Sequence, residues 1–233
     1  MSEQERALPY DGKTIAGYFL RAHPNFQYRE LFVQLLLEAR RAFLNECPRA
    51  SMVVSAEALL RVVFDQIVKL ATQHGAATVL RGPNSGLSDD AATDLLFDLP
   101  EELNFCKALK IIERMKAFPE VIIEQMYVVK DLRNRAVHGD LPLLDTWEPP
   151  VAREDLREML SNSDWDVPEA YRFIARKGSG KWYVFRLQDH TCGTLRPLSD
   201  EERFAAIQYL IVLSILKHII NSCPSDFDAV LSD

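Results

Sequence analysis

The sequence predicts a mainly α-helical protein with a small β-hairpin before its last helix. Three observations support this fold class. Apolar residues recur with the helical period over long stretches, helix-start and helix-stop residues separate these stretches, and aromatic residues cluster around one glycine turn. Of the 233 residues, 48% are hydrophobic and 26% are charged. This is the balance of a soluble globular protein, and it excludes an intrinsically disordered chain.

The first part of the chain, up to Gly139, is predicted to be helical. Its apolar residues recur every three or four positions, and prolines stand at helix starts, where a missing N–H does no harm. Glycines and Pro83 predict a loop over His74–Asp90. Gly139 ends the last helix of this part, with Pro142 just beyond. The predicted helices are Tyr28–Asn45, Arg49–Gln73, Ser88–Phe97, Pro100–Ala117 and Glu120–His138.

The second part of the chain carries the predicted hairpin and the last helix. Aromatic and β-branched residues flank a turn at Lys177–Gly180. Ser199, followed three residues later by Glu202, is a capping-box pattern that starts the last helix. We expect one domain over residues 1–233. The predicted elements are a connection over Leu141–Pro150, a short helix over Arg153–Leu160, strands over Ala170–Arg176 and Lys181–Leu187, and a helix ending near Asn221.

The cysteines and the N-terminus indicate a cytoplasmic protein without a metal, a cofactor or a membrane segment. The four cysteines lie far apart and form no C-x-x-C pair, so we expect free thiols and no structural zinc site. Polar residues open the chain at Met1–Arg6, so no signal peptide is expected. Phe204–Ile220 is apolar but too short for a membrane span, and it contains Lys217 and His218. We expect it to be buried in a core or in a subunit interface.

Basic residues concentrate in one region of an acidic chain. The formal net charge is −7, which argues against a general DNA-coating protein. Between residues 105 and 139, however, seven basic residues stand against four acidic ones. A site for an anionic ligand requires such a local excess. The alternative is that these side chains only solvate outer helix faces, and it is the better interpretation for Lys107, Lys110 and Lys116.

The end of the helix predicted over Glu120–His138 places Arg133, Asn134 and His138 close together in sequence. At about 100° per residue, Asn134 and His138 share one face, whereas Arg133 points about 140° away from His138. One helix therefore does not readily aim Arg133 and His138 at the same atom. A second copy of the helix, crossing near this segment, would give a cleft lined by two arginines and two histidines.

These residue types suit the cleavage of RNA. Histidine titrates near neutral pH and moves protons as a general acid or base. Arginine stays charged and holds phosphate oxygens in a fork geometry. Together they suffice for metal-free cleavage in which the 2′-hydroxyl of RNA is the nucleophile. The alternative is an ordinary histidine at a helix C-terminus, where the macrodipole favours it, with exposed arginines nearby.

The segment Leu132–Gly139 resembles the R-x-x-x-x-H motif of the HEPN superfamily, including the asparagine that often follows the arginine. A looser similarity lies in Pro48–Arg61, which looks like the early helix of that family with its A-x-E-x-L-L pattern. The similarity covers roughly Ala50–Asp140. It implies a HEPN-like helical core over about residues 28–140, followed by the C-terminal hairpin and helix within residues 151–233.

The resemblance implies a helical bundle that dimerises and that in many members is a metal-independent endoribonuclease, often a toxin or an antiviral-defence protein. Carried over to this sequence, Arg133 and His138 match the catalytic pair and Asn134 the polar residue between them. Glu57 corresponds to an acidic residue that faces the site in some members, with an ordinary exposed helix glutamate as the equal alternative. Asp140 replaces the tyrosine of toxins that pair with nucleotidyltransferases, which argues against such a partner.

The leading hypothesis is therefore a HEPN-type ribonuclease that acts as a homodimer, with RNA as its substrate and an antitoxin or regulatory protein as a possible partner. Arg135, Lys130 and Arg114 are the expected RNA-binding residues, because they belong to the basic region. The alternative is a non-catalytic HEPN-like module that binds a nucleotide, an RNA or a protein.

Overall fold

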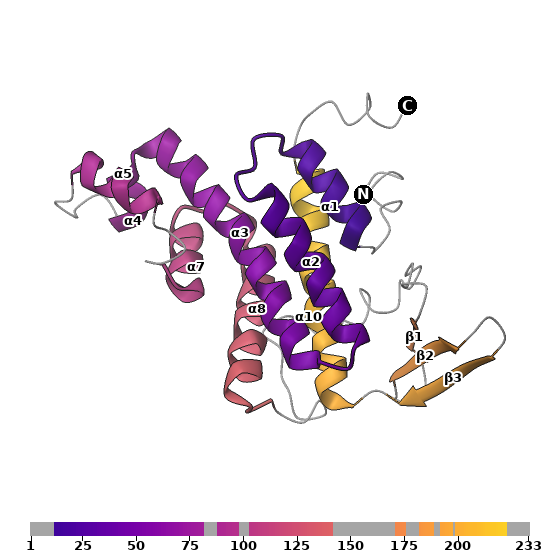
Figure 1. Cartoon of the computed structure of the whole chain (residues 1–233). Helices are drawn as coiled ribbons and strands as arrows, with labels where there is room; N and C mark the ends of the chain where they lie inside the picture. The colour runs from indigo at the N-terminus through magenta and orange to yellow at the C-terminus, as the bar shows by residue number, and fades with distance from the viewer. Residues whose placement is uncertain are drawn as a thin grey trace.

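Helices dominate the part of the chain that the structure describes, which confirms a mainly α fold (Figure 1). The computed structural model describes residues 12–81, 88–97, 103–141, 171–175, 182–188, 192–197 and 199–222. The helices are α1 (Gly12–Ala22), α2 (Arg29–Leu44), α3 (Pro48–His74), α4 (Ala76–Arg81), α5 (Asp89–Phe97), α7 (Phe105–Arg114), α8 (Glu120–His138) and α10 (Asp200–Asn221).

Three long helices, α3, α8 and α10, pack against one another at the centre of the helical part. Helix α8 runs opposite in direction to α3 and α10, so the C-terminus of α8 lies at the same end as the N-termini of the other two (Figure 1). Helix α2 packs along α3, and α1 lies against α2 and α10. This arrangement brings Arg49, Gly139 and Glu201, which are far apart in sequence, to one end of the three helices.

Helix α10 is a core helix of this chain. From Phe204 to Ile220 none of its described residues is exposed, because α1, α3 and α8 cover it from several sides. By length and composition alone α10 could cross a membrane, but 72% of its most apolar stretch is buried inside the protein. Length and composition alone do not distinguish a membrane span from a buried core helix of a soluble protein. Of the two predicted locations, core and subunit interface, the structure places this helix in the core.

A buried polar group fixes how α10 lies on α3. The side chain of Gln208 is fully buried, and its Nε2 donates to the Met52 carbonyl and to Ser55 Oγ, the latter at 2.9 Å. Ser55 Oγ also donates to the Met52 carbonyl at 3.2 Å. Gln208 Oε1 is buried without a hydrogen-bond partner among the described residues. An amide with specific partners favours one register of the two helices over alternatives that apolar contacts alone would allow.

The predicted helix ends agree with the structure where their capping chemistry is strong. Ser199 Oγ accepts from the Glu202 amide at 3.3 Å, and the Glu202 carboxylate accepts from the Ser199 amide at 2.8 Å, which completes the predicted capping box of α10. Gly139 follows α8 in the left-handed conformation, with φ of 74°, and so ends the helix as predicted.

Three helical predictions need correction. Helix α1 was not expected, and α4 lies inside the stretch predicted as a loop, after Gly75 has turned the chain. Within the predicted helix Pro100–Ala117, the described residues show a helix that starts at Phe105, because Asn104 is extended and its side chain caps the Lys107 amide at 3.0 Å; Pro100 lies outside the described residues. The helix predicted over Arg153–Leu160 lies outside the described residues.

Three strands form an antiparallel sheet in the order β1-β2-β3. Strand β1 (Tyr171–Ala175) pairs with β2 (Trp182–Gln188), with Phe173 opposite Val184, and β2 pairs with β3 (Cys192–Pro197). The glycine turn of the predicted hairpin lies outside the described residues, so the hairpin itself stays a prediction. Strand β3 has no counterpart in the sequence-based expectations.

Candidate functional site

Helix α8 separates an apolar face from a polar one near its C-terminus. Its buried face is formed by residues at helical spacing: Ile122, Met126, Val129, Leu132 and Ala136. Asn134, which is half-buried, and His138, which is exposed, lie on the opposite side, whereas the half-buried Arg133 lies where α8 meets α3. The packing of Leu132 and Ala136 thus leaves Asn134 and His138 on the outer side of α8 and Arg133 beside α3.

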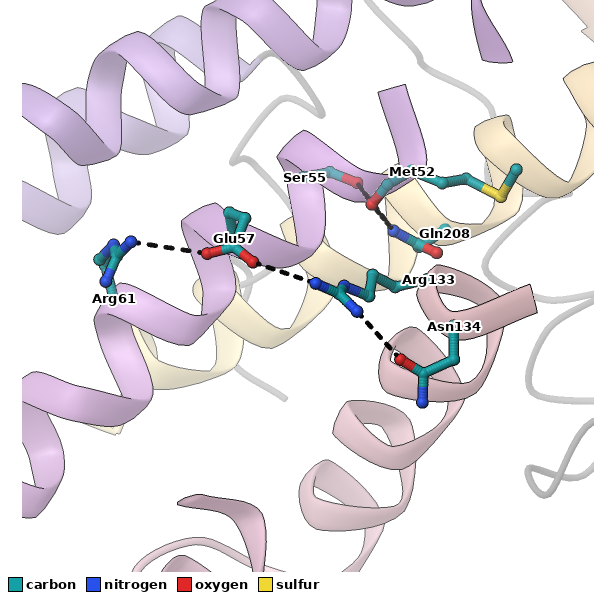
Figure 2. A network of polar contacts seen from close by, with 7 residues as sticks. All are labelled: Met52, Ser55, Glu57, Arg61, Arg133, Asn134 and Gln208. Carbon is teal, nitrogen blue, oxygen red and sulfur yellow. Dashed lines mark hydrogen bonds and ion pairs between the residues drawn. The ribbon is translucent and has the colours of Figure 1, made fainter. Parts of the chain in front are cut away.

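Arg133 lies within a polar cluster that joins α8 to α3 (Figure 2). Its guanidinium donates to Asn134 Oδ1 at 3.2 Å and lies 3.7 Å from Glu57 Oε1. The side chains of Arg133 and Glu57 are 33% and 29% exposed, so the ion pair is partly screened by water. Glu57, the possible accessory residue, therefore contacts Arg133 directly, and the glutamate of α3 helps to hold the guanidinium on this face.

Arg61 is a member of this cluster that the sequence analysis missed. Its guanidinium lies 3.5 Å from Glu57 Oε2, so the carboxylate stands between two arginines. The Arg61 guanidinium also lies over the rings of Tyr28 and Phe64, at 5.8 and 5.6 Å from their centres. The four-residue spacing from Glu57 to Arg61 was the available signal, because such pairs face each other on a helix.

Beyond Arg61, charged side chains on α3 continue toward the connection between α1 and α2. Asp65, almost fully buried, accepts from the Gln27 amide at 3.1 Å and pairs with Lys69 at 2.7 Å. Burial lowers the pKa of His23, an effect that Lys69 increases and Asp65 opposes. Burial also raises the pKa of Tyr28, against the opposing effect of Arg61. Charged side chains at four-residue intervals on α3 therefore extend from the Arg133 cluster to the connection between α1 and α2.

His138 stands apart from the Arg133 cluster. It is the last residue of α8, one turn beyond Asn134, and among the described residues no hydrogen bond or ion pair reaches it. The structure thus brings together Arg133, Asn134 and Glu57, but it does not connect them to His138 within one chain. This separation agrees with the divergence of Arg133 and His138 around the helix.

The three residues expected to bind RNA lie in different surroundings. Arg135 Nε donates to Asp131 at 2.8 Å, and this hydrogen bond raises the pKa of the guanidinium. Lys130 lies 5.6 Å from the centre of the Tyr127 ring. Arg114 donates to the carbonyl of Val79 in α4. Lys130 and Arg135 share α8 with the cluster, whereas Arg114 links α7 to α4.

A further ion pair lies near the C-terminus of α8. Arg49, in the first turn of α3, donates from Nε and NH2 to Glu201 Oε1 of α10, at 3.1 and 2.5 Å. This hydrogen bond raises the pKa of the Arg49 guanidinium. A Cβ atom at Gly139 would lie only 3.2 Å from Arg49 NH1, so the guanidinium packs directly against the residue after His138.

The described residues include no group of three or more histidine, cysteine or acidic side chains that could hold a metal ion. Comparison with models of protein families, with curated proteins and with solved structures gives no match. The function is therefore argued from the residues of this site.

Proposed function

We propose that this protein is a metal-independent endoribonuclease of HEPN type that cleaves RNA by attack of the 2′-hydroxyl. The observation that carries the proposal is the cluster in which Glu57 and Asn134 contact the half-buried guanidinium of Arg133, on the helix that ends at an accessible His138. As part of the same proposal, the helices form a HEPN-like bundle, with the β-hairpin inserted before α10.

The proposed reaction needs a proton acceptor, a proton donor and a stabiliser of negative charge. The 2′-oxygen forms a bond to phosphorus while the bond to the 5′-oxygen breaks, so a base removes the 2′-proton and an acid protonates the leaving 5′-oxygen. His138 serves in proton transfer, because its imidazole is exposed at the end of α8, where a bound RNA strand can reach it. Arg133 stabilises the charge that develops on the phosphoryl oxygens, and Asn134 orients its guanidinium.

A homodimer is part of the proposal, because His138 lies outside the Arg133 cluster of its own chain. In a two-fold pair whose α8 helices approach each other, Arg133 of one chain and His138 of the other act on one phosphate. Heterodimers of Arg133→Ala and His138→Ala subunits then keep one intact copy of each residue. Partial recovery of cleavage on mixing the two inactive variants is expected, and a monomer that cleaves RNA at the full rate contradicts the shared site.

RNA cleavage in EDTA by the purified protein, compared with His138→Ala, tests the chemistry. The wild-type protein is expected to release products with 2′,3′-cyclic phosphate and 5′-hydroxyl ends, and the variant to be inactive. Equal cleavage by the two proteins identifies a contaminant and refutes the assignment of His138. Products with 5′-phosphate ends refute attack by the 2′-hydroxyl.

A non-catalytic module that binds RNA, a nucleotide or a protein is the second candidate. One observation favours it: no described group orients the His138 ring, although catalytic histidines usually depend on a hydrogen-bonded partner. RNA binding without cleavage, unchanged by His138→Ala and weakened by Arg133→Ala, supports this candidate over the nuclease.

The proposed setting is the cytoplasm, where the nuclease acts as a toxin or as an antiviral effector and is restrained by an antitoxin or a regulatory protein. Induced expression of the wild-type protein is then expected to arrest growth, while the His138→Ala protein at equal abundance does not. Equal growth of the two strains contradicts the role as a toxin.

A further inference from the structure

We propose that Arg49 binds a phosphate group of the RNA strand beside His138, and that Glu201 occupies its guanidinium when no RNA is bound. The inference rests on the proposed function and adds to it a residue outside the R-x-x-x-x-H segment. It also assigns α10 a role at the site, through the carboxylate of Glu201.

The position of Arg49 supports this role. Its NH1 group packs against Gly139, which directly follows His138, so the guanidinium lies at the end of α8 that presents the proposed catalytic histidine. A side chain at residue 139 would intrude on this position, since its Cβ would lie 3.2 Å from NH1. Glycine therefore keeps the guanidinium next to the site as well as ending the helix.

The hydrogen bonds of Arg49 leave donors available. Nε and NH2 both donate to a single carboxylate oxygen, Glu201 Oε1, instead of forming a fork with two oxygens. No hydrogen bond from NH1 to a described residue is present, and the Arg49 side chain is 49% exposed. A phosphodiester has two non-bridging oxygens, so it can accept from NH1 with one while the other replaces Glu201 at the remaining nitrogens.

The exchange of Glu201 for a phosphate requires little free energy. An ion pair whose side chains are 49% and 39% exposed contributes little to stability, because water screens both charges. A phosphodiester, by contrast, brings its own negative charge and releases bound counterions. Glu201 therefore acts as a weak competitor that keeps Arg49 neutralised in a protein of net charge −7 until RNA is present.

Binding of a 2′-O-methylated oligoribonucleotide, which cannot be cleaved by 2′-hydroxyl attack, tests the inference at several salt concentrations. Arg49→Met is expected to weaken binding roughly five- to tenfold and to lower the slope of log K against log salt by about 0.7. Arg81→Met is the matched control, because Arg81 is an exposed arginine that ends α4, a helix far from the C-terminus of α8 (Figure 1). This control is expected to bind within about twofold of the wild type.

Glu201→Gln separates phosphate binding from a purely structural contact. If Arg49 binds RNA, Glu201→Gln removes its competitor and strengthens RNA binding in the wild-type background but not in Arg49→Met. The gain in affinity is also expected to exceed that of the remote control Asp94→Asn. If the ion pair only holds α3 against α10, Arg49→Met and Glu201→Gln both weaken binding. The inference is supported if Arg49→Met lowers and Glu201→Gln raises the affinity for RNA, and it is overturned if both substitutions change the affinity in the same direction.

The outcomes also separate this inference from the proposed function. A wild-type protein that does not bind RNA refutes both. A wild-type protein that binds RNA, with Arg49→Met unchanged in affinity and salt slope, overturns the role of Arg49 and leaves the proposed function standing. If circular dichroism shows that Arg49→Met does not fold, the comparison of Glu201→Gln with Asp94→Asn decides. The inference is overturned if Glu201→Gln does not raise the affinity for RNA more than Asp94→Asn does.

Discussion

Replacing Glu57 with glutamine tests the polar cluster most directly, because the change removes a charge while keeping the shape of the side chain. Glu57 forms ion pairs of 3.5 Å with Arg61 and 3.7 Å with Arg133. Two unit charges 4 Å apart attract by about 1 kcal/mol in water and by about 4 kcal/mol at a protein surface of low dielectric. The carboxylate is 29% exposed, and exposed pairs yield about 0.5 kcal/mol each in practice, so the expected loss of stability is about 1 kcal/mol.

This loss leaves the protein folded. For a chain of this size, about 1 kcal/mol lowers the melting temperature by roughly 2–4 °C. The difference between Glu57→Gln and the wild type is expected to shrink at 1 M salt, because screening reduces both ion pairs. Circular dichroism at low and high salt measures both effects.

The effect on cleavage is expected to be larger than the effect on stability. Without the carboxylate, Arg133 keeps only its hydrogen bond to Asn134 and is less well positioned for the transition state. We expect kcat to fall about tenfold or more with KM unchanged or lower, since removal of the negative charge does not weaken RNA binding.

Arg61→Gln is the control, because it removes the other ion pair of Glu57 and leaves the one to Arg133. It is expected to lower stability by a similar amount while cleavage remains near the wild-type rate. The reasoning is refuted if Glu57→Gln cleaves RNA at the wild-type kcat, or if Arg61→Gln lowers kcat equally.

Three further predictions concern stability. Gln208→Leu is expected to unfold in urea with a free energy within about 1 kcal/mol of the wild type, because the loss of two hydrogen bonds is offset by removal of the unsatisfied Oε1. Gln208→Ala is expected to cost about 3 kcal/mol, because it also leaves a cavity. Equal losses for the two variants would contradict this balance. Gly139→Ala is expected to cost about 1–2 kcal/mol, because its φ is 74° and its Cβ approaches Arg49; an unchanged urea midpoint would contradict it. The pKa of His23 is lowered on folding, so the unfolded chain binds more protons below about pH 6.5 and stability falls there. His23→Gln is expected to lose less stability than the wild type between pH 7.5 and pH 5.5, and an equal loss would show that His23 does not contribute.

Short-range chemistry is what the sequence predicts well. The end of α8 follows from Gly139 and the start of α10 from the capping box at Ser199, because each depends on residues within one helical turn. The position of His138 at the exposed end of this helix follows in the same way from Gly139. For this reason the predicted bounds of the helix over Glu120–His138 agree with the structure.

Contacts between distant segments could not be predicted from one sequence. Arg49 and Glu201 are separated by 152 positions, and no local pattern signals that helix ends so far apart will meet. The apolar segment Phe204–Ile220 left a core or a subunit interface open, and α1, α3 and α8 cover it within the chain. Its composition therefore does not by itself indicate a subunit interface, and the proposed dimer rests on the geometry of Arg133 and His138.

The position of α10 between α1, α3 and α8 has a consequence for how the protein is made. The ribosome completes α8 about 60 residues before α10 begins, which corresponds to roughly 3–12 s of synthesis. During that time the apolar faces of α3 and α8 lack the helix that covers them. In a nascent chain, Arg49 therefore cannot pair with Glu201, and Gln208 cannot donate to the Met52 carbonyl, until α10 has emerged. Under the proposed function, this chain therefore begins to cleave RNA only after α10 has emerged from the ribosome.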